Sequence, residues 1–117
     1  DKDIRILAIR AVQAGALTSK MDREPHPSGR DKPDFDDYER AEPFRELAKK
    51  WGESPASLAH RYALSIQKVS SVILGVKNIE ELRECIKTEK MIPLNQEQIK
   101  ELENLFKKWL SYFNKFI

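Results

Sequence analysis

The sequence predicts an α/β fold that is mostly helical and contains two strands of the parallel type. Residues 4–9 and 69–74 are short runs rich in β-branched and aliphatic residues, a composition typical of strands that are covered on both faces. Elsewhere apolar residues recur at steps of three and four, which is the spacing of helices that bury one face. The length of 117 residues allows a single domain of modest size.

The second strand is followed by the signals of a strand-turn-helix unit. The run 69–74 ends at Gly75, and Asn78 is a suitable N-cap for a helix over residues 79–88. Free backbone N–H groups and the positive end of the helix dipole would meet at this turn, which makes it a natural place for an anion. Gly75 would let a ligand approach the backbone, and Lys77 would add a full charge. The same residues also suit a plain turn and cap, so the pattern leaves both interpretations open.

Caps and periodicity predict three further helices. One ends at Gly52, the next begins with Ser54 as its N-cap and Pro55 in its first turn, and the last begins at Asn95, with Gln98 three residues on. The apolar positions expected to face the core are Tyr38, Phe44, Leu47, Ala48 and Trp51 in the first helix, Leu58, Ala59, Tyr62, Ala63 and Ile66 in the second, and Ile99, Leu102, Leu105, Phe106, Trp109 and Phe113 in the last.

Two segments stand apart from these elements. Residues 21–34 are polar and rich in proline, which predicts an exposed loop of a length that is usually functional or mobile. Residues 107–117 continue the last helix as an apolar extension. We expect this extension either to pack on the body of the fold or to form a surface for another subunit, which would make the chain a homo-oligomer.

The composition excludes several classes of protein. With 21 Lys and Arg residues against 19 Asp and Glu residues in mixed order, the sequence shows no clustered basic face for a nucleic acid. Cys85 is the single cysteine and cannot form an internal disulfide, which favours a reducing, cytoplasmic location. No apolar run approaches the roughly 20 residues of a membrane span, and the first residues do not form a signal peptide. Because the sequence lacks an initiator Met and enters a strand almost at once, we expect a piece of a longer chain.

The number of elements points to part of a larger sheet. Two parallel strands would expose two unpaired edges, which compact proteins usually avoid. In a (β/α)8 TIM barrel the phosphate site lies on the loops after the seventh and eighth strands. The present chain ends with a strand, a loop, a helix and one more helix, as the C-terminus of such a barrel would. We therefore expect a single partial domain over residues 1–117, the C-terminal part of a TIM barrel.

Three segments carry a resemblance to a known family. They are residues 7–18 (LAIRAVQAGALT), 47–65 (LAKKWGESPASLAHRYALS) and 70–82 (SSVILGVKNIEEL). The first resembles the seventh-strand segment of the aldo/keto reductases, the last resembles their eighth strand and cofactor loop, and the middle one resembles the helix pair between the two. The resemblance runs from about Ile4 to Phe106 in the family's order and spacing.

This resemblance implies the NAD(P)H-dependent reduction of a small aldehyde or ketone in a TIM barrel, with the cofactor extended across the carboxyl ends of the strands. It assigns the pyrophosphate and the nicotinamide side of the cofactor to Arg10, Val12, Gly15, Leu17 and Lys20. It assigns the adenosine and its ribose phosphate to Gly75, Val76, Lys77, Glu81, Glu84 and Cys85.

The sequence departs from the family's pattern at three places in this set. Many members have Ser-Pro-Leu where this chain has Arg10, Ala11 and Val12, which changes the expected pyrophosphate contacts. Glu81 stands where an Arg or Gln commonly meets the adenosine end, and its charge would repel a 2′-phosphate, which favours NAD over NADP. Cys85 stands where Asn usually binds the adenine, and a thiol cannot donate and accept as an amide does.

The family's catalytic Asp, Tyr, Lys and His come from earlier strands, and the chain has no matching motif for them. The tyrosines and histidines that are present are Tyr38, Tyr62, Tyr112, His26 and His60. We therefore expect a cofactor-binding segment of a reductase that is inactive alone. The alternative is a non-catalytic half-barrel module that oligomerises through its helices or strand edges.

The remaining polar residues are better explained by structure than by catalysis. His60 lies between residues that must be buried, so a packing or surface role is favoured, while His26 lies in a polar loop and is expected to be solvated. Cys85 is expected to be a buried structural thiol. The acidic residues between Asp34 and Asp37 should favour a helix N-terminus through the dipole, and no residues stand at the spacing of a metal site.

Overall fold

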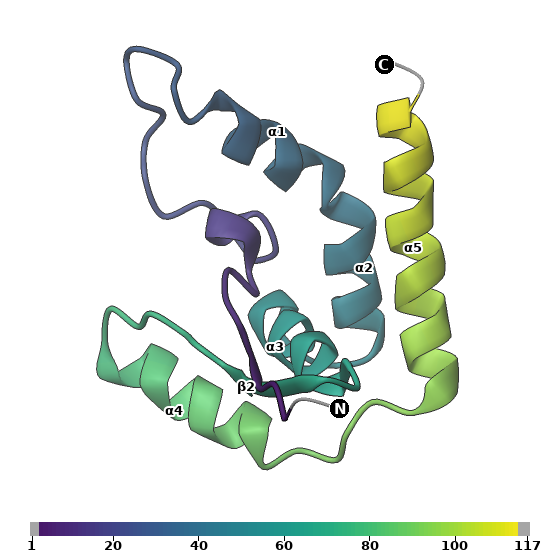
Figure 1. Cartoon of the computed structure of the whole chain (residues 1–117). Helices are drawn as coiled ribbons and strands as arrows, with labels where there is room; N and C mark the ends of the chain where they lie inside the picture. The colour runs from purple at the N-terminus through teal and green to yellow at the C-terminus, as the bar shows by residue number, and fades with distance from the viewer. Residues whose placement is uncertain (1–2, 115–117) are drawn as a thin grey trace.

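The computed structural model of the chain describes residues 3–114, with side chains to residue 108. A two-stranded sheet lies beside a group of helices, and the longest helix, α5, runs alongside α2 (Figure 1). The elements are β1 (Ile6–Ala8), the short 3-10 helix η1 (Gln13–Gly15), α1 (Lys32–Arg40), α2 (Glu42–Lys50), α3 (Pro55–Ser65), β2 (Val69–Val72), α4 (Ile79–Glu89) and α5 (Gln96–Asn114).

The two strands pair in parallel, as the sequence predicts. Ala8 lies opposite Val72, and the backbone N–H of Ile73 donates to the carbonyl oxygen of Ala8 at 2.9 Å. The register is irregular between Ile6 and Leu7, and both strands are shorter than their apolar runs. Parallel pairing brings the carboxyl ends of both strands to the same edge of the sheet.

The prediction that both strands are covered on two faces is wrong for this chain. Ile6 is 42% exposed and Leu7, on the opposite face, is 57% exposed. The physical reason is that α3 packs against β2, while β1 has only one hydrogen-bonded strand beside it among residues 3–114. Ile66, which the sequence places in the core, is 47% exposed, because α3 ends at Ser65 and Ile66 lies in the connection between α3 and β2.

The helix predicted across Tyr38 to Trp51 is broken into α1 and α2 at Ala41. Pro43 explains the break, because it has no backbone N–H and its ring would clash with the carbonyl group four residues earlier. Arg45 compensates for the break by donating from its guanidinium group to the carbonyl oxygens of Tyr38 at 2.6 Å and Ala16 at 3.2 Å. Helix α1 also begins at residue 32, so the last three residues of the predicted loop 21–34 are helical.

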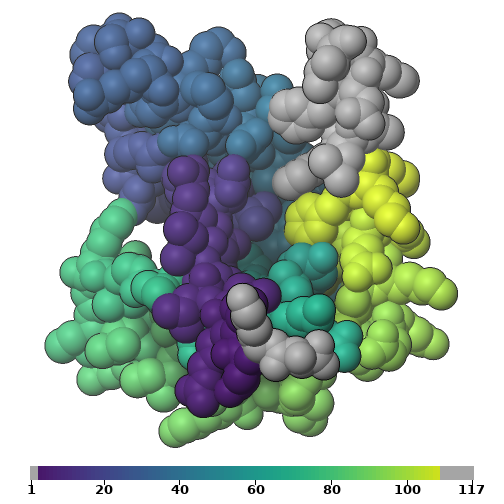
Figure 2. All heavy atoms as spheres, in the orientation of Figure 1, coloured from purple at the N-terminus to yellow at the C-terminus, as the bar shows by residue number. Residues whose placement is uncertain are grey.

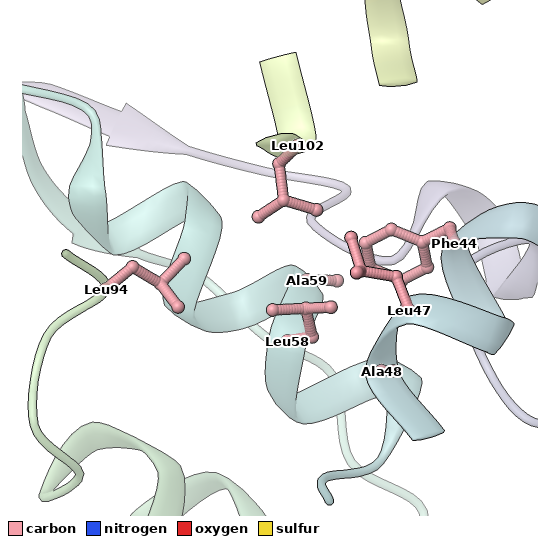
Figure 3. Close-up of a cluster of buried hydrophobic side chains, with 7 residues drawn as sticks. All are labelled: Phe44, Leu47, Ala48, Leu58, Ala59, Leu94 and Leu102. Carbon is pink, nitrogen blue, oxygen red and sulfur yellow. The ribbon is translucent and has the colours of Figure 1, made fainter. Parts of the chain in front are cut away.

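The hydrophobic core lies where α2, α3 and α5 meet. Figure 3 shows seven buried side chains from these helices and from the segment before α5, namely Phe44, Leu47, Ala48, Leu58, Ala59, Leu94 and Leu102. Phe106 of α5 extends this cluster, with its ring centroid 6.1 Å from that of Phe44 and 5.2 Å from that of Tyr62. Most of the core predicted from helical periodicity is therefore confirmed. Of the last helix's predicted apolar positions, the side chains of Trp109 and Phe113 lie outside the described part.

The predicted caps are confirmed at the start of three helices. Ser54 Oγ accepts the backbone N–H of Ser57 at 3.1 Å, and Asn78 Oδ1 accepts that of Glu81 at 2.9 Å. At α5 a reciprocal capping box forms between Asn95 and Gln98. These bonds fix where α3 and α4 begin, and both helix starts face the edge of the sheet at which the two strands end. Within residues 3–114 no helix combines the length and the apolar character that a bilayer crossing requires.

Candidate functional site

A cavity of about 480 Å³ lies at the carboxyl ends of the two strands. Its walls come from residues 12–23 after β1, the first turns of α3, the turn after β2 and the first turns of α4. In Figure 2 a hollow separates α4, in green, from the segment after β1, in purple. The volume falls within the range of small-molecule sites.

The cavity brings together most of the residues that the sequence assigned to a cofactor. Those that line it are Val12, Gly15, Lys20, Gly75, Val76, Lys77, Glu81, Glu84 and Cys85. The two exceptions are Arg10, which forms an ion pair with Asp34 at 3.7 Å, and Leu17, which packs against the hydrophobic core. Two stretches that are distant in the sequence, residues 12–20 and 75–85, thus meet at one place.

The backbone after β1 adopts an uncommon conformation at the mouth of this cavity. Arg10, Gln13 and Ala14 have positive φ angles of 57°, 50° and 53°, and Gly15 follows at 97°. The left-handed region is unfavourable for residues with a side chain and is found disproportionately at functional sites. The turn is held by the backbone N–H groups of Gly15 and Leu17, which both donate to the carbonyl oxygen of Val12 at 3.1 Å.

The loop between η1 and α1 is exposed, but it is fastened to its surroundings at several points. Arg23 donates to the carbonyl oxygen of Ala14 at 3.0 Å and to the carboxylate of Asp34 at 2.9 Å. Asp22 forms an ion pair with Lys77, which ties the loop to the turn after β2 across the cavity. The loop is therefore one wall of the cavity.

The turn after β2 carries its own acidic residue at the position expected for an anion. Glu81 Oε2 accepts the backbone N–H of Lys77 at 2.8 Å, so the carboxylate folds back onto the turn. The Lys77 ammonium group is paired with Asp22. A phosphate that approached this turn would have to displace both acidic groups. No atom lies within 4 Å of the position that a Cβ atom would occupy at Gly75, so there is open space beside the backbone here.

The wall between α3 and α4 is built from polar side chains that meet at close range. Ser54 donates from its hydroxyl group to Glu84 Oε1 while it caps α3. His60 lines the cavity although its side chain is buried, and its Nδ1 atom has no hydrogen-bond partner among the described residues. Burial lowers the pKa of His60, and the nearby Glu84 carboxylate partly opposes this shift. His60 is thus neutral at pH 7, with one donor and one acceptor nitrogen.

Cys85 stands beside this wall as a half-buried thiol, whereas the sequence predicted a buried one. Partial burial raises its pKa, and the charges of Glu84 and Glu81 raise it further. The side chain therefore stays protonated at neutral pH and acts as a small, weakly polar group in the cavity lining.

Sequence reasoning missed Ser54, His60 and Asp22 as members of the site. In the sequence, the role of Ser54 as an N-cap and a packing role for His60 explain both residues. Neither residue therefore indicates that it also lines a cavity. Asp22 lies in a polar loop, and its ion pair with Lys77 connects residues far apart in the sequence. Only the fold brings these groups to the same cavity.

Tyr38, Tyr62 and His26 do not line the cavity, and the side chain of Tyr112 lies outside the described part of the chain. The Tyr38 hydroxyl group donates to the carbonyl oxygen of Ser19 at 2.8 Å, and Tyr62 packs against Phe106. The ring of His26 is half-buried and hydrogen-bonds to Ser28 at 2.8 Å. Across the described part of the chain, no three His, Cys, Asp or Glu side chains are arranged to hold a metal ion.

Comparison with known sequences decides the family of this chain. A sequence model of the aldo/keto reductase family matches residues 1–107 of the 117 residues. The chain belongs to the aldo/keto reductase family. No curated protein matched the sequence. Aldo/keto reductases are TIM-barrel oxidoreductases that generally use NAD(P)H and carbonyl substrates, and two parallel strands with flanking helices are consistent with a fragment of that barrel.

Proposed function

We propose that the cavity binds a nicotinamide dinucleotide and that this chain is the cofactor-binding segment of an aldo/keto reductase. The observation that carries the proposal is the convergence of residues 12–20, 75–77 and 81–85 on one cavity at the carboxyl ends of the strands. In parallel sheets that end is where ligands bind, because loops and helix N-termini gather there.

The residues of the cavity suit the parts of such a cofactor. Lys20, Arg23 and Lys77 supply positive charge for phosphate groups, and the open space at Gly75 allows a ligand to approach the backbone. The wall formed by α3 and α4 supplies apolar surface and a few polar groups for the adenosine half. When bound in the complete barrel, the nicotinamide supplies the hydride for carbonyl reduction, and the residues of this chain bind and orient it.

We further propose that the site prefers NAD(H) to NADP(H). Asp22, Glu81 and Glu84 line the same cavity as its three cationic residues, so the lining has no excess of positive charge. Glu81 in particular lies against the backbone N–H of Lys77, where a 2′-phosphate would meet its negative charge. Substitution of Glu81 by Gln should narrow the difference in affinity between NADH and NADPH, which fluorescence titration measures directly.

The walls of the cavity all come from this chain, so the chain alone should bind the adenosine half of the cofactor. Titration with NADH and with ADP-ribose tests this, and Gly75→Val should block binding by filling the open space beside the backbone. Lys100→Met, on the exposed side of α5, is a matched control that should bind normally. If neither ligand binds the unaltered chain, the cofactor-binding function is overturned. We expect no carbonyl reduction by the chain alone, because the family's catalytic tetrad has no counterpart in it.

One observation favours the alternative of an interaction module. Leu7 of β1 is 57% exposed, and Ile4 and Ile9 on either side of this strand are 74% and 67% exposed, while the outer edge of β1 is unpaired in the described fold. Large exposed apolar side chains on an open sheet edge favour association with another chain. Sedimentation analysis distinguishes the two functions: stable oligomers without nucleotide affinity would favour the interaction module, and a monomer that binds NADH would exclude it.

A further inference from the structure

Helix α4 has an apolar stripe on its outer side that no described residue covers. Ile79, Leu82 and Ile86 are 60%, 45% and 47% exposed, and they follow one another at helical steps of three and four residues. The opposite side of the helix packs against α3, and Figure 1 shows α4 at the edge of the described fold. A helix that faces only water normally has a polar outer side, so this stripe indicates that another surface covers it.

The stripe has the spacing of a seam between two packed helices. Steps of three and four residues give its members the a, d and a positions of a heptad repeat. Arg83 and Lys90 then take the e positions beside the seam. In paired helices the residues at the e and g positions form ion pairs with the partner and so decide which helix binds. The pattern therefore favours a partner helix with acidic residues beside its own seam.

The cations beside the stripe are available to such a partner. Arg83, Lys87 and Lys90 form no ion pair with any residue in the described part of the chain. Together with Ile86 and Met91 they line a shallow hollow of about 510 Å³ on this side of α4. The hollow therefore offers apolar surface for a side chain of the partner and positive charge for the carboxylates around it.

The acidic residues of α4 do not neutralise this surface. Glu81 and Glu84 line the cavity on the opposite side of the helix. Glu80 and Glu89 lie near the two ends of α4, where they would face the headgroups of an anionic membrane and weaken its attraction. The seam is also narrower than the apolar face with which helices lie in a membrane surface. A protein helix is therefore favoured over a lipid surface.

A second copy of the chain fits this surface less well than an acidic helix does. Two α4 helices packed antiparallel would bring their e positions together, so Arg83 and Lys90 of one copy would meet the same cations of the other. Two parallel helices would place Cys85, at the g position, next to these cations. Neither arrangement offers them a carboxylate.

We propose that the outer side of α4 is a docking surface for an amphipathic helix of another protein, which carries apolar residues at its seam and acidic residues beside it. Ile79, Leu82 and Ile86 pack against this seam, and Arg83 and Lys90 pair with the flanking carboxylates. The cavity lies on the opposite side of α4, so the partner helix docks without covering a bound nucleotide. The inference goes beyond the proposed cofactor function and does not depend on it.

Two synthetic helical peptides test the charge preference. Both carry leucine at the a and d positions, and they differ only in having Glu or Lys at the e and g positions. In calorimetric titration the 117-residue chain should bind the Glu peptide at least about fivefold more tightly than the Lys peptide, and added salt should reduce this difference. The backbone amide NMR signals of residues 79–90 should shift when the Glu peptide is added.

Reversal of the two e-position charges is the decisive variant. Arg83→Glu combined with Lys90→Glu should reverse the preference, so that the Lys peptide becomes the tighter ligand. Lys100→Glu combined with Lys107→Glu is the matched control, because it makes the same change of charge at the same spacing on the exposed side of α5. This control should keep the preference for the Glu peptide.

The seam itself is tested by a pair of truncations. Ile86→Ala should weaken the binding of the Glu peptide by at least about threefold, because it removes apolar surface from the stripe. Leu64→Ala, at a residue of similar exposure on α3, should leave the binding unchanged. Circular dichroism and thermal unfolding of each variant show whether a change in binding reflects a change in fold.

Several outcomes would overturn the inference. Equal binding of the two peptides by the unaltered chain would mean that the stripe is a general apolar surface, and a preference that survives the charge reversal would exclude the cations from the interface. Binding to vesicles of phosphatidylserine and phosphatidylcholine, with neither peptide bound, would assign the surface to a membrane. Oligomers in sedimentation that Ile86→Ala dissociates would assign it to a second copy of the chain.

Discussion

The helical core and the strand face of this chain differ greatly in how completely their apolar side chains are buried. Phe44, Leu58 and Leu102 are fully buried where α2, α3 and α5 meet, whereas Ile4 and Leu7 of the strand region remain mostly exposed. The helices bury one another's apolar faces, whereas the sheet has apolar surface that no described residue covers. The fold of this chain therefore depends on its helices, and the sheet depends on them for its position.

The largest test of this comparison is a pair of truncations to alanine. Phe44→Ala removes a fully buried ring and should lower the free energy of unfolding by about 3–5 kcal/mol. Leu7→Ala removes a side chain that is 57% exposed and should cost less than about 1 kcal/mol. Urea denaturation followed by circular dichroism measures both. A greater loss for Leu7→Ala would mean that the strand face is covered in solution.

The next test concerns a buried ion pair that joins the core to its connecting segments. Arg61 of α3 pairs with Glu53, and the two side chains are only 10% and 7% exposed. Arg61 also donates to the carbonyl oxygen of Ile92 at 2.7 Å, which fixes the segment before α5. Arg61→Met should lower the free energy of unfolding by about 3 kcal/mol, because it leaves the Glu53 carboxylate buried without its opposite charge, with only the hydrogen bond from Ser57. The double variant with Glu53→Gln should recover part of the loss, and no recovery would contradict this explanation.

A smaller effect is expected at Ser54, where the helical core meets the cavity. Ser54→Ala removes the cap of α3 and the bond to Glu84, and it should lower the free energy of unfolding by about 1 kcal/mol. Asn78→Ala is the matched control, since it removes the cap of α4 but leaves Ser54 and Glu84 in contact. Both variants should have similar stability, because each loses one N-cap hydrogen bond. A clearly larger loss for Ser54→Ala would show that its bond to Glu84 adds to the stability of the fold.

The smallest effect is a dependence of stability on pH. Burial lowers the pKa of His60 in the folded protein below the value of 6.5 expected in the unfolded chain. Between the two pKa values the unfolded chain binds more protons, so the free energy of unfolding falls as the pH is lowered from 6.5 toward the folded pKa. His60→Asn should flatten this part of the profile, as measured by urea denaturation at pH 7.5, 6.5 and 5.5. A profile that is unchanged in the variant would assign the dependence to other groups.

Local signals in the sequence were sufficient for the helical core but not for the sheet. Caps such as Ser54, and apolar periodicity such as that of Phe44 and Leu58, depend on a few neighbouring residues and predicted their elements correctly. The burial of β1 failed as a prediction because it depends on which other elements lie nearby. The break at Ala41 was missed because the apolar period continues across it, although Pro43 carries the signal.

The candidate site could likewise be predicted only in part from the sequence. The resemblance to the aldo/keto reductases named two distant segments that the fold brings to one cavity, so residues such as Gly15 and Lys77 were selected in advance. The ion pair of Asp22 with Lys77 was missed because the two residues are far apart in the sequence and no local spacing indicates that they meet. His60 was missed because its unpaired Nδ1 atom becomes visible only when its surroundings are known.

The turn after β1 has a consequence for protein engineering. Ala14 has a φ angle of 53°, a conformation that costs residues with a side chain about 1–2 kcal/mol and costs glycine almost nothing. Glycine would also loosen the unfolded chain, which opposes the gain by about 0.4–1 kcal/mol. Ala14→Gly should therefore raise the melting temperature slightly. A position at the rim of the cavity that becomes more stable with a smaller residue is a good starting point for variants that accept bulkier ligands.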